Sequence, residues 1–256
     1  MKTGAFAFCV IFWFCLSVST VAQHRQVSPD GAVIRGPVSK KQIALVFTGH
    51  EFAEGAAETL DALKHQRAKA SFFLTGDFLA NSNRAALVSR IVRDGHYLGP
   101  HSDKHLLYCS WQGPATTLIT HQQFREDLQS NLKKIESFGV ARSNITFFLP
   151  PFEHCNDEIV KWTSEMGLTL VNYTPGTRSN ADYTGEADSN FVSSKIIFLS
   201  REKSDPNGLN GFILLLHVGA GPSRKDKFHN RFGELLEHLS RRGYRFVRVD
   251  ELLASE

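Results

Sequence analysis

The sequence predicts an α/β fold, a single (β/α) barrel of about seven strands that departs from the regular eight-stranded form. Short β-rich apolar runs alternate with longer amphipathic stretches, and polar residues suited to chemistry follow directly after several of the apolar runs. Strands that alternate with helices pair in parallel through crossover connections, so this pattern indicates a closed or nearly closed barrel. A doubly wound open sheet is the alternative.

The strands and helices are expected to alternate from residue 42 to the end of the chain. Apolar runs rich in β-branched and aromatic residues predict strands at 43–47, 70–74, 96–99, 145–149, 168–173, 211–217 and 245–249. Amphipathic stretches predict helices at 55–66, 84–94, 121–138, 156–166, 190–203 and 225–242. No repeat or linker divides this region, so we expect one barrel domain over residues 42–256.

The N-terminal segment has the features of a secretory signal peptide. One lysine precedes an apolar run, and small residues follow up to Ala22, which predicts a signal peptide over 1–22. The apolar run is too short to span a bilayer, so we expect a secreted or periplasmic protein with no membrane span in the mature chain. Residues 23–41 are polar and contain Pro and Gly, and they predict an extended lead-in.

Composition excludes several classes of protein. The chain of 256 residues is 42% hydrophobic and 21% charged, which is typical of a globular protein. Its formal net charge is only +3 and it has no basic run, so we expect no nucleic-acid partner. Cys109 and Cys155 remain after the predicted cleavage; they could pair in an oxidising compartment, but the sequence does not decide whether they do.

Residues that could carry chemistry cluster at the carboxyl ends of the predicted strands. They lie at 48–51, 101–105, 150–154, 174–182 and 217. In α/β barrels the loops at this end converge on one mouth, where active sites are assembled. The position of these residues therefore favours an enzyme.

His101 and His105 are four residues apart, a spacing that on a helical turn brings both imidazoles to one side and lets them share a metal ion. The alternative is a pair on a solvated helix face. His217 ends the apolar run from Phe212, where a titratable group is a natural general acid, or otherwise a histidine of the core. Glu153 follows two prolines that fix the backbone where it leaves a strand.

The order and spacing of these pieces resemble the polysaccharide deacetylases of the NodB-homology type, carbohydrate esterase family 4. The likeness covers residues 43–253. The segment TLDALKHQRAKASFFLTGDFL looks like that family's helix and second strand, and DGHYLGPHSDKH resembles its His-x-x-x-His metal motif. FFLPPFEHCN is similar to its Arg-Pro-Pro loop, and GFILLLH matches its strand that ends in leucine-x-histidine. The resemblance implies a NodB-like barrel.

Two positions depart from the family's pattern. The family carries two adjacent aspartates after phenylalanine, one the catalytic base and one a metal ligand, where this chain has Thr48 and Gly49. The arginine that holds the base aspartate is Leu149 here. Loss of the aspartate alone would leave a charge unpaired in the site, which is costly. The joint loss therefore indicates a rearranged site.

The resemblance implies a divalent metal held by His101 and His105. Because the usual aspartate is absent, the third ligand is expected to be Glu51, with His50 as the alternative. Two histidines and one glutamate are a known ligand set for catalytic zinc, so zinc is the expected cofactor.

The resemblance also implies an acid and a base. Glu153 is the expected base because its loop flanks the same mouth, and His50 and Glu51 are the alternatives; His217 is the expected acid. Asp182 is the nearest counterpart of the family aspartate that orients the acid histidine.

The implied reaction is hydrolysis of an N- or O-linked acetyl group from a carbohydrate, which is the expected partner. The metal would polarise the acetyl carbonyl and lower the pKa of its bound water. Four aromatic residues near the mouth are candidates for stacking on sugar rings, with core packing or loop cover as the alternative for each: Tyr108, Trp111, Phe152 and Tyr173. The alternatives are a carbohydrate-binding protein without activity and an amidase acting on a non-carbohydrate amide.

Overall fold

The computed structural model describes residues 25–113, 115–200 and 205–254, so the predicted signal peptide lies outside the described residues. The strands are β1 (Gln26–Val27), β2 (Val33–Arg35), β3 (Gln42–Gly49), β4 (Ser71–Leu74), β5 (Tyr97–Pro100), β6 (Phe147–Phe148), β7 (Thr169–Leu170), β8 (Phe212–His217) and β9 (Arg245–Val247). The helices are α1 (Ala56–His65), α2 (Gly76–Ala80), α3 (Ala85–Arg93), α4 (His121–Glu136), α5 (Asp157–Glu165), α6 (Ser194–Ser200), α7 (His229–Arg241) and α8 (Val249–Leu252).

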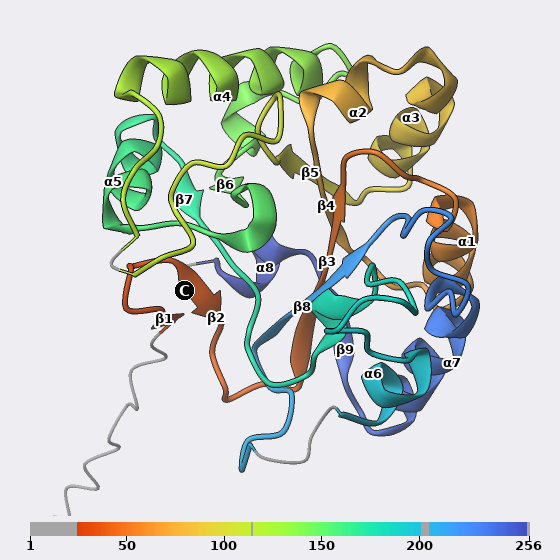
Figure 1. Ribbon diagram of the computed structural model, residues 1–256. Coiled ribbons are helices and arrows are strands. Elements are labelled where there is room, and N and C mark those ends of the chain that lie inside the picture. The colour runs from red at the N-terminus through yellow and green to blue at the C-terminus, as the bar shows by residue number, and fades with distance from the viewer. Residues whose placement is uncertain (1–24, 114, 201–204, 255–256) are drawn as a thin grey trace, which may run out of the picture.

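The strands form a curled seven-stranded sheet and a separate pair, which together complete the barrel. Its order is β1-β2-β8-β3-β4-β5, with β9 also paired to β3, and β6 and β7 pair separately. Single contacts join the two parts: the Leu149 amide donates to the Pro100 carbonyl at 3.3 Å, and Val33 bridges to Val171. Helices surround the strands in Figure 1. The predicted distorted (β/α) barrel is therefore confirmed.

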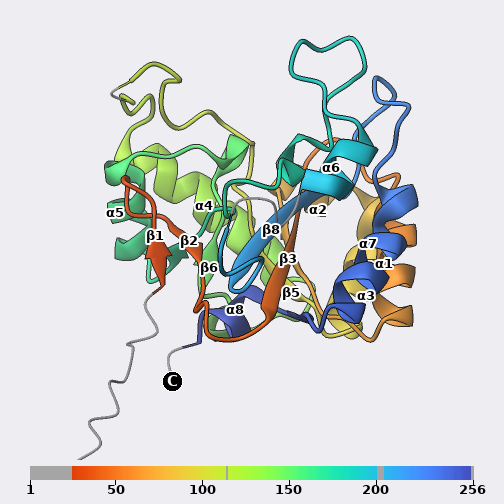
Figure 2. The same ribbon diagram turned by 90° about the horizontal axis from the view of Figure 1, so that it is seen from below.

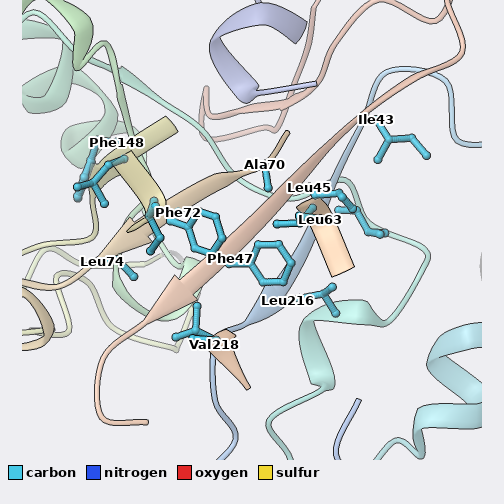
Figure 3. Close-up of a cluster of buried hydrophobic side chains, with 14 of the residues drawn as sticks. Ile43, Leu45, Phe47, Leu63, Ala70, Phe72, Leu74, Phe148, Leu216 and Val218 are labelled. Atoms are coloured by element: carbon cyan, nitrogen blue, oxygen red, sulfur yellow. The ribbon is translucent and has the colours of Figure 1, made fainter. Parts of the chain in front are cut away.

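Alternation along the strands gives the barrel two cores. Residues of the outer face pack under the helices, and Figure 3 labels ten members of this cluster, including Phe47 and Phe72, whose ring centroids are 5.1 Å apart. The intervening residues fill the interior of the barrel, among them Ala44, Val46, Phe73, Ile213 and Leu215. Because successive side chains of a strand point to opposite faces, the next inward positions beyond Val46 and Leu215 are Thr48 and His217.

A short helix closes the floor of the barrel. The strand predicted over 245–249 ends at Val247, and α8 follows it. Val249 and Leu252 belong to the interior cluster, and the Val249 amide donates to the Ser71 hydroxyl at 2.8 Å. Figure 2 shows α8 at one end and long loops rising from the other. Apolar side chains therefore fill the end of the barrel that α8 closes, and a site can form only at the opposite end, where the long loops lie.

The structure contains a second helix that the sequence pattern did not predict. Thr75 directly follows β4 and caps α2, because its hydroxyl accepts a hydrogen bond from the Phe78 amide at 3.1 Å. The longer helix α4 also has a threonine cap, since Thr120 and Gln123 form a capping box at its start.

Both cysteines of the described chain are buried free thiols, Cys109 and Cys155. Burial raises the pKa of Cys109 to about 11 and that of Cys155 to about 12, so both stay protonated at neutral pH. Within residues 25–254, apart from the two gaps, no helix is long and apolar enough to cross a membrane.

Candidate active site

A cavity of about 430 Å³ opens at the carboxyl ends of the strands. It is lined by residues from several loops: Thr48, Gly49, His50, Glu51, Phe52, His101, His105, Trp111, Phe152, Glu153, Tyr183, Asp188, His217, Gly219, Ala220 and Ser223. Every residue predicted from the sequence to be catalytic or to bind metal lies in this set. The prediction that the strand ends meet at one mouth thus agrees with the cavity.

His217 ends β8 and is held by Asp182. Its Nδ1 donates to one carboxylate oxygen at 2.6 Å, and its backbone amide donates to the other at 3.0 Å. Burial alone would lower the pKa of His217, but the charge and hydrogen bond of Asp182 outweigh it and the pKa lies above its ordinary value. Since the carboxylate can only accept, Nδ1 carries a proton and Nε2 is the nitrogen left for the cavity.

The loop that carries Asp182 is fixed by a buried arginine. The guanidinium of Arg224, which is fully buried, donates to the carbonyls of Thr184 at 2.8 Å and Val192 at 2.9 Å. A third hydrogen bond reaches the Ala181 carbonyl at 3.3 Å. Arg224 therefore ties the segment beside His217 to the loop after Asp182. Its position, distant in sequence from the other motifs, gave no signal from which to predict this role.

Glu153 enters the cavity from a strained turn. Phe152 and Glu153 have φ values of 58° and 53°, a region that non-glycine residues seldom occupy. The side-chain amide of Asn172 donates to the Glu153 carbonyl at 2.6 Å and holds this conformation. Burial raises the pKa of Glu153 to about 7, although His217 opposes the shift. A carboxyl group of this kind accepts and releases a proton near neutral pH.

The three remaining histidines form a cluster beside these two groups. The rings of His50 and His105 lie 4.5 Å apart, and those of His101 and His105 lie 5.2 Å apart. His101 Nδ1 donates to the carbonyl of Leu149 at 2.8 Å, which leaves Nε2 free. Burial lowers the pKa of His101 well below its ordinary value and that of His105 to about 4. These two imidazoles are therefore neutral at pH 7.

The loop with His101 and His105 is not a helical turn, contrary to the prediction. Residues 101–105 form an irregular segment in which Ser102 and His105 have positive φ values of 68° and 53°. Asp127 fixes it, because its carboxylate accepts the amides of Asp103 and Lys104 at 3.0 Å each. The two rings come together through this bend rather than through helical spacing.

The predicted third ligands stand on the loop after β3. His50 Nδ1 lies 3.1 Å from the Thr75 hydroxyl, and Glu51 is exposed at the edge of the cavity. Arg84 donates to the backbone carbonyls of both residues and so fixes their main chain.

As they stand, these side chains do not fit a three-ligand zinc site. The rings of His50 and His105 are stacked at an interplanar angle of 14°. Because imidazole lone pairs lie in the ring plane, two stacked rings cannot point at one ion. Among the residues that the structure describes, no three His, Cys, Asp or Glu side chains form a group that could hold a metal ion.

The aromatic residues divide into two groups. Trp111, 63% exposed, stacks on His154 at 4.4 Å and stands with Phe152 at the cavity. Tyr108 is only 1% exposed and its hydroxyl donates to Asp127, so the expectation that it lies at the mouth is wrong. Tyr108 belongs to the hydrophobic core, and the loop that follows β5 becomes exposed only further along, at Trp111.

Tyr173 is partly buried against the interior of the barrel and is not among the residues lining the cavity. Tyr183 lines it instead, 4.8 Å from the ring of His217, and Asp188 follows on the same loop. Sequence reasoning missed both residues because their loop has no periodicity; the proximity of Tyr183 to Asp182 was the available signal.

Comparison with known proteins places the chain in a family. Residues 35–171 match the family model described as polysaccharide deacetylase. A peptidoglycan-N-acetylglucosamine deacetylase of Bacillus cereus is 26% identical over 231 residues, which cover 90% of this chain and 97% of that protein. A peptidoglycan-N-acetylmuramic acid deacetylase of Bacillus subtilis is 24% identical over 223 residues, which cover 85% of this chain and 73% of that protein.

Solved structures share the fold. A crystal structure of a peptidoglycan N-acetylglucosamine deacetylase superposes with a TM-score of 0.70 at 21% identity, covering 87% of this chain and 92% of the other. A pseudoenzyme of carbohydrate esterase family 4 from Bacillus anthracis gives a TM-score of 0.66 at 20% identity, and the superposition covers 88% of this chain and 69% of the other. The family model spans more than half of the sequence, and the chain therefore belongs to the polysaccharide deacetylase family.

Proposed function

We propose that this protein is a carbohydrate deacetylase that hydrolyses an N- or O-linked acetyl group, with Glu153 and His217 as its proton carriers. One observation carries the proposal: a carboxyl group with a pKa of about 7 and a histidine oriented by a carboxylate line the same cavity. General acid and base groups work best when their pKa values lie near the operating pH.

The two groups have distinct tasks. Glu153 takes a proton from the water that attacks the acetyl carbonyl, and its raised pKa makes it a stronger base than an exposed carboxylate. His217 gives a proton to the departing nitrogen or oxygen of the sugar, and Asp182 stabilises the charged ring. Trp111 and Phe152 offer aromatic faces at the mouth on which a sugar ring can stack.

The names of the relatives suggest the first substrates to test. Proteins 24–26% identical to this chain act on the N-acetyl groups of peptidoglycan, so peptidoglycan fragments come first, before chitin oligomers and acetylated xylan. Such a substrate lies outside the cytoplasm, which agrees with the predicted export of the chain through residues 1–22.

Zinc binding stays a separate proposal. His101 and His105 would be two ligands, since both are neutral and His101 has a free nitrogen, and Glu51 or His50 would be the third after one stacked ring turns. Metal analysis of the purified chain tests it. About one equivalent of zinc that is lost in both His101→Ala and His105→Ala supports the site, whereas equal metal content in these variants excludes it.

A carbohydrate-binding protein without turnover is the second candidate. The absence of a carboxylate at Thr48 and Gly49 and the exposed aromatic faces at the mouth favour it. It predicts binding of a glycan with no acetate released.

The decisive experiment measures acetate released from each glycan by the wild-type chain and by Glu153→Gln. We expect Glu153→Gln to lower turnover by about 10²- to 10⁴-fold, the usual contribution of a general base. Binding with no acetate from any glycan would favour the second candidate.

A further inference from the structure

Exposed cations gather where β3 begins and where α7 turns into β9. One segment precedes β3, and the other runs from the end of α7 to the start of β9. We call their exposed lysine and arginine side chains the basic face: Lys40, Lys41, Arg241, Arg242 and Arg245. The dipole at the C-terminus of α7 accounts for Arg241 and Arg242 but not for the other members.

Hydrogen bonds hold the two segments of the basic face side by side. The Arg245 amide donates to the Lys41 carbonyl at 2.9 Å, and Lys41 Nζ donates to the Arg242 carbonyl at 3.0 Å. Glu237 pairs with Arg241 and offsets its charge. Lys41 and Arg245 form no ion pair with any residue that the structure describes, so their charges are open to an outside partner.

An exposed apolar side chain stands beside these cations. Val38 lies in the turn between β2 and β3, close before Lys40, and is 42% exposed. The turn is fixed, because the Asn210 side chain donates to the Val38 carbonyl at 2.9 Å and the Gly36 amide donates to the Gly211 carbonyl at 2.7 Å. An anionic membrane accommodates such a pair of features, since cations bind its headgroups while apolar groups enter the boundary with the acyl chains.

The basic face lies at the opposite end of the barrel from the cavity. The cavity opens at the carboxyl ends of the strands, whereas Lys41 and Arg245 stand at the amino ends of β3 and β9. Figure 2 shows the turn between β2 and β3 at the same end as α8. The described residues that line the cavity include Glu51, Glu153 and Asp188 but no lysine or arginine. An anionic surface therefore attracts the basic face and repels the mouth.

We propose that the basic face docks on the anionic headgroups of a phospholipid membrane, with Val38 in the headgroup layer and the cavity facing away from the membrane. The proposal goes beyond the reaction and does not depend on it. A soluble linear polyanion would satisfy the cations but would give Val38 no role, so a membrane fits the surface better. Docking in this orientation presents the cavity to glycans outside the membrane.

Vesicle binding by the exported protein tests the docking. Phosphatidylcholine vesicles with about 30% phosphatidylglycerol should bind the protein at about 50 mM salt and release it at about 0.5 M, and phosphatidylcholine alone should not bind it. Each Lys or Arg near such a surface strengthens binding about fivefold, so Lys41→Gln with Arg245→Gln should lower the partition coefficient about 25-fold. Arg125→Gln with Lys161→Gln is the matched control, because it removes the same charge from exposed positions on α4 and α5.

Val38 separates a membrane from a soluble polyanion. Val38→Thr keeps the branched shape but adds a hydroxyl, so binding to the anionic vesicles should fall about fivefold, whereas Val27→Thr, exposed on β1, should change nothing. All variants share the same N-terminus, so any contribution from it cancels. Equal losses in the two double variants, equal binding to neutral vesicles, or binding to polyphosphate without binding to the anionic vesicles overturns the proposal.

Acrylamide quenching of tryptophan fluorescence tests the orientation. Trp111 stands at the mouth and is 63% exposed, whereas Trp162 is 9% exposed, so the quenching reports on Trp111. We expect the same quenching in free and vesicle-bound protein, because the mouth faces away from the membrane. Loss of quenching on the vesicles would place the mouth against the membrane and overturn the proposed docking.

Discussion

His217 and His101 line the same cavity, but their ring nitrogens have different partners. His217 Nδ1 donates to the carboxylate of Asp182, and His101 Nδ1 donates to the carbonyl of Leu149. Both are buried, yet the pKa of His217 is raised and that of His101 is lowered. A single carboxylate thus gives two buried histidines of the same cavity pKa shifts of opposite sign.

The largest effect is expected from removing that carboxylate. Asp182→Asn keeps the shape of the side chain but takes away the charge that raises the pKa of His217. We predict a loss of about 10²- to 10⁴-fold in acetate release, since the histidine loses the carboxylate that orients it and raises its pKa. Asp188→Asn is the control on the same loop, because that residue also lines the cavity and does not contact His217. Equal losses in the two variants would remove Asp182 from the mechanism.

A second prediction concerns the pH dependence of the wild-type protein. Glu153 must be ionised to act as a base, and burial raises its pKa to about 7. Activity should therefore rise with pH up to about 7 and fall about tenfold per unit below it. The initial rate between pH 5 and pH 8 checks this on a substrate without titratable groups. A profile that is flat between pH 5 and pH 7 would show that Glu153 is not the base.

A buried histidine outside the cavity should weaken the fold on acidification. His96 lies away from the cavity, and its Nδ1 accepts the Ala70 amide at 3.2 Å. Burial, with a smaller effect from Lys69, lowers its pKa from 6.5 to about 4, so between these values the unfolded chain binds more protons. Stability present above about pH 6.5 is lost as the pH falls toward 4, by up to about 3 kcal/mol.

Denaturant unfolding at pH 7 and pH 5 measures this loss. His96→Asn keeps an acceptor near the Ala70 amide but cannot be protonated, so its stability should fall less on acidification than that of the wild type. His65→Asn, at the exposed end of α1, is the control. The same pH response in wild type and His96→Asn would place the acid sensitivity elsewhere.

The smallest effect is expected at the rim. Trp111 is exposed beside the cavity and makes no contact with Glu153 or His217 among the described ring contacts. Trp111→Ala should raise KM by about tenfold and leave kcat unchanged, as expected for loss of one aromatic stacking contact. Leu118→Ala, also exposed and on the same long loop, should change neither constant. A fall in kcat alone would indicate that Trp111 positions the reacting groups.

The barrel was predictable because its strands carry a strong signal. Buried parallel strands such as β3 and β8 read as continuous apolar runs, and both lie where the sequence places them. The four-residue helix α8 was hidden, because its apolar residues read as a continuation of β9. The start of α2 could have been predicted from Thr75 and the acidic Asp77 in the first turn of the helix. It was missed because these residues directly follow the apolar run of β4.

The titratable residues that the sequence predicted for the candidate site do line one cavity, but their geometry was not predictable. The motif positions of Glu153, His217 and His101 follow from the ends of strands. Positive φ values at His105 and Phe152 have no signature in non-glycine residues, so the bend that stacks the histidine rings could not be read from spacing. The fully buried Arg224 shows the same limit, since its partners are backbone carbonyls of a distant loop.

Acetate release from a peptidoglycan fragment or an N-acetylglucosamine oligomer, measured for wild type and Glu153→Gln side by side, tests whether this protein is a deacetylase with Glu153 as its base. We expect steady release by the wild type and a rate about 10²- to 10⁴-fold lower in the variant, with unchanged folding and unchanged glycan binding. Wild-type protein that binds these glycans and releases no acetate, or equal rates in the two proteins, would contradict it.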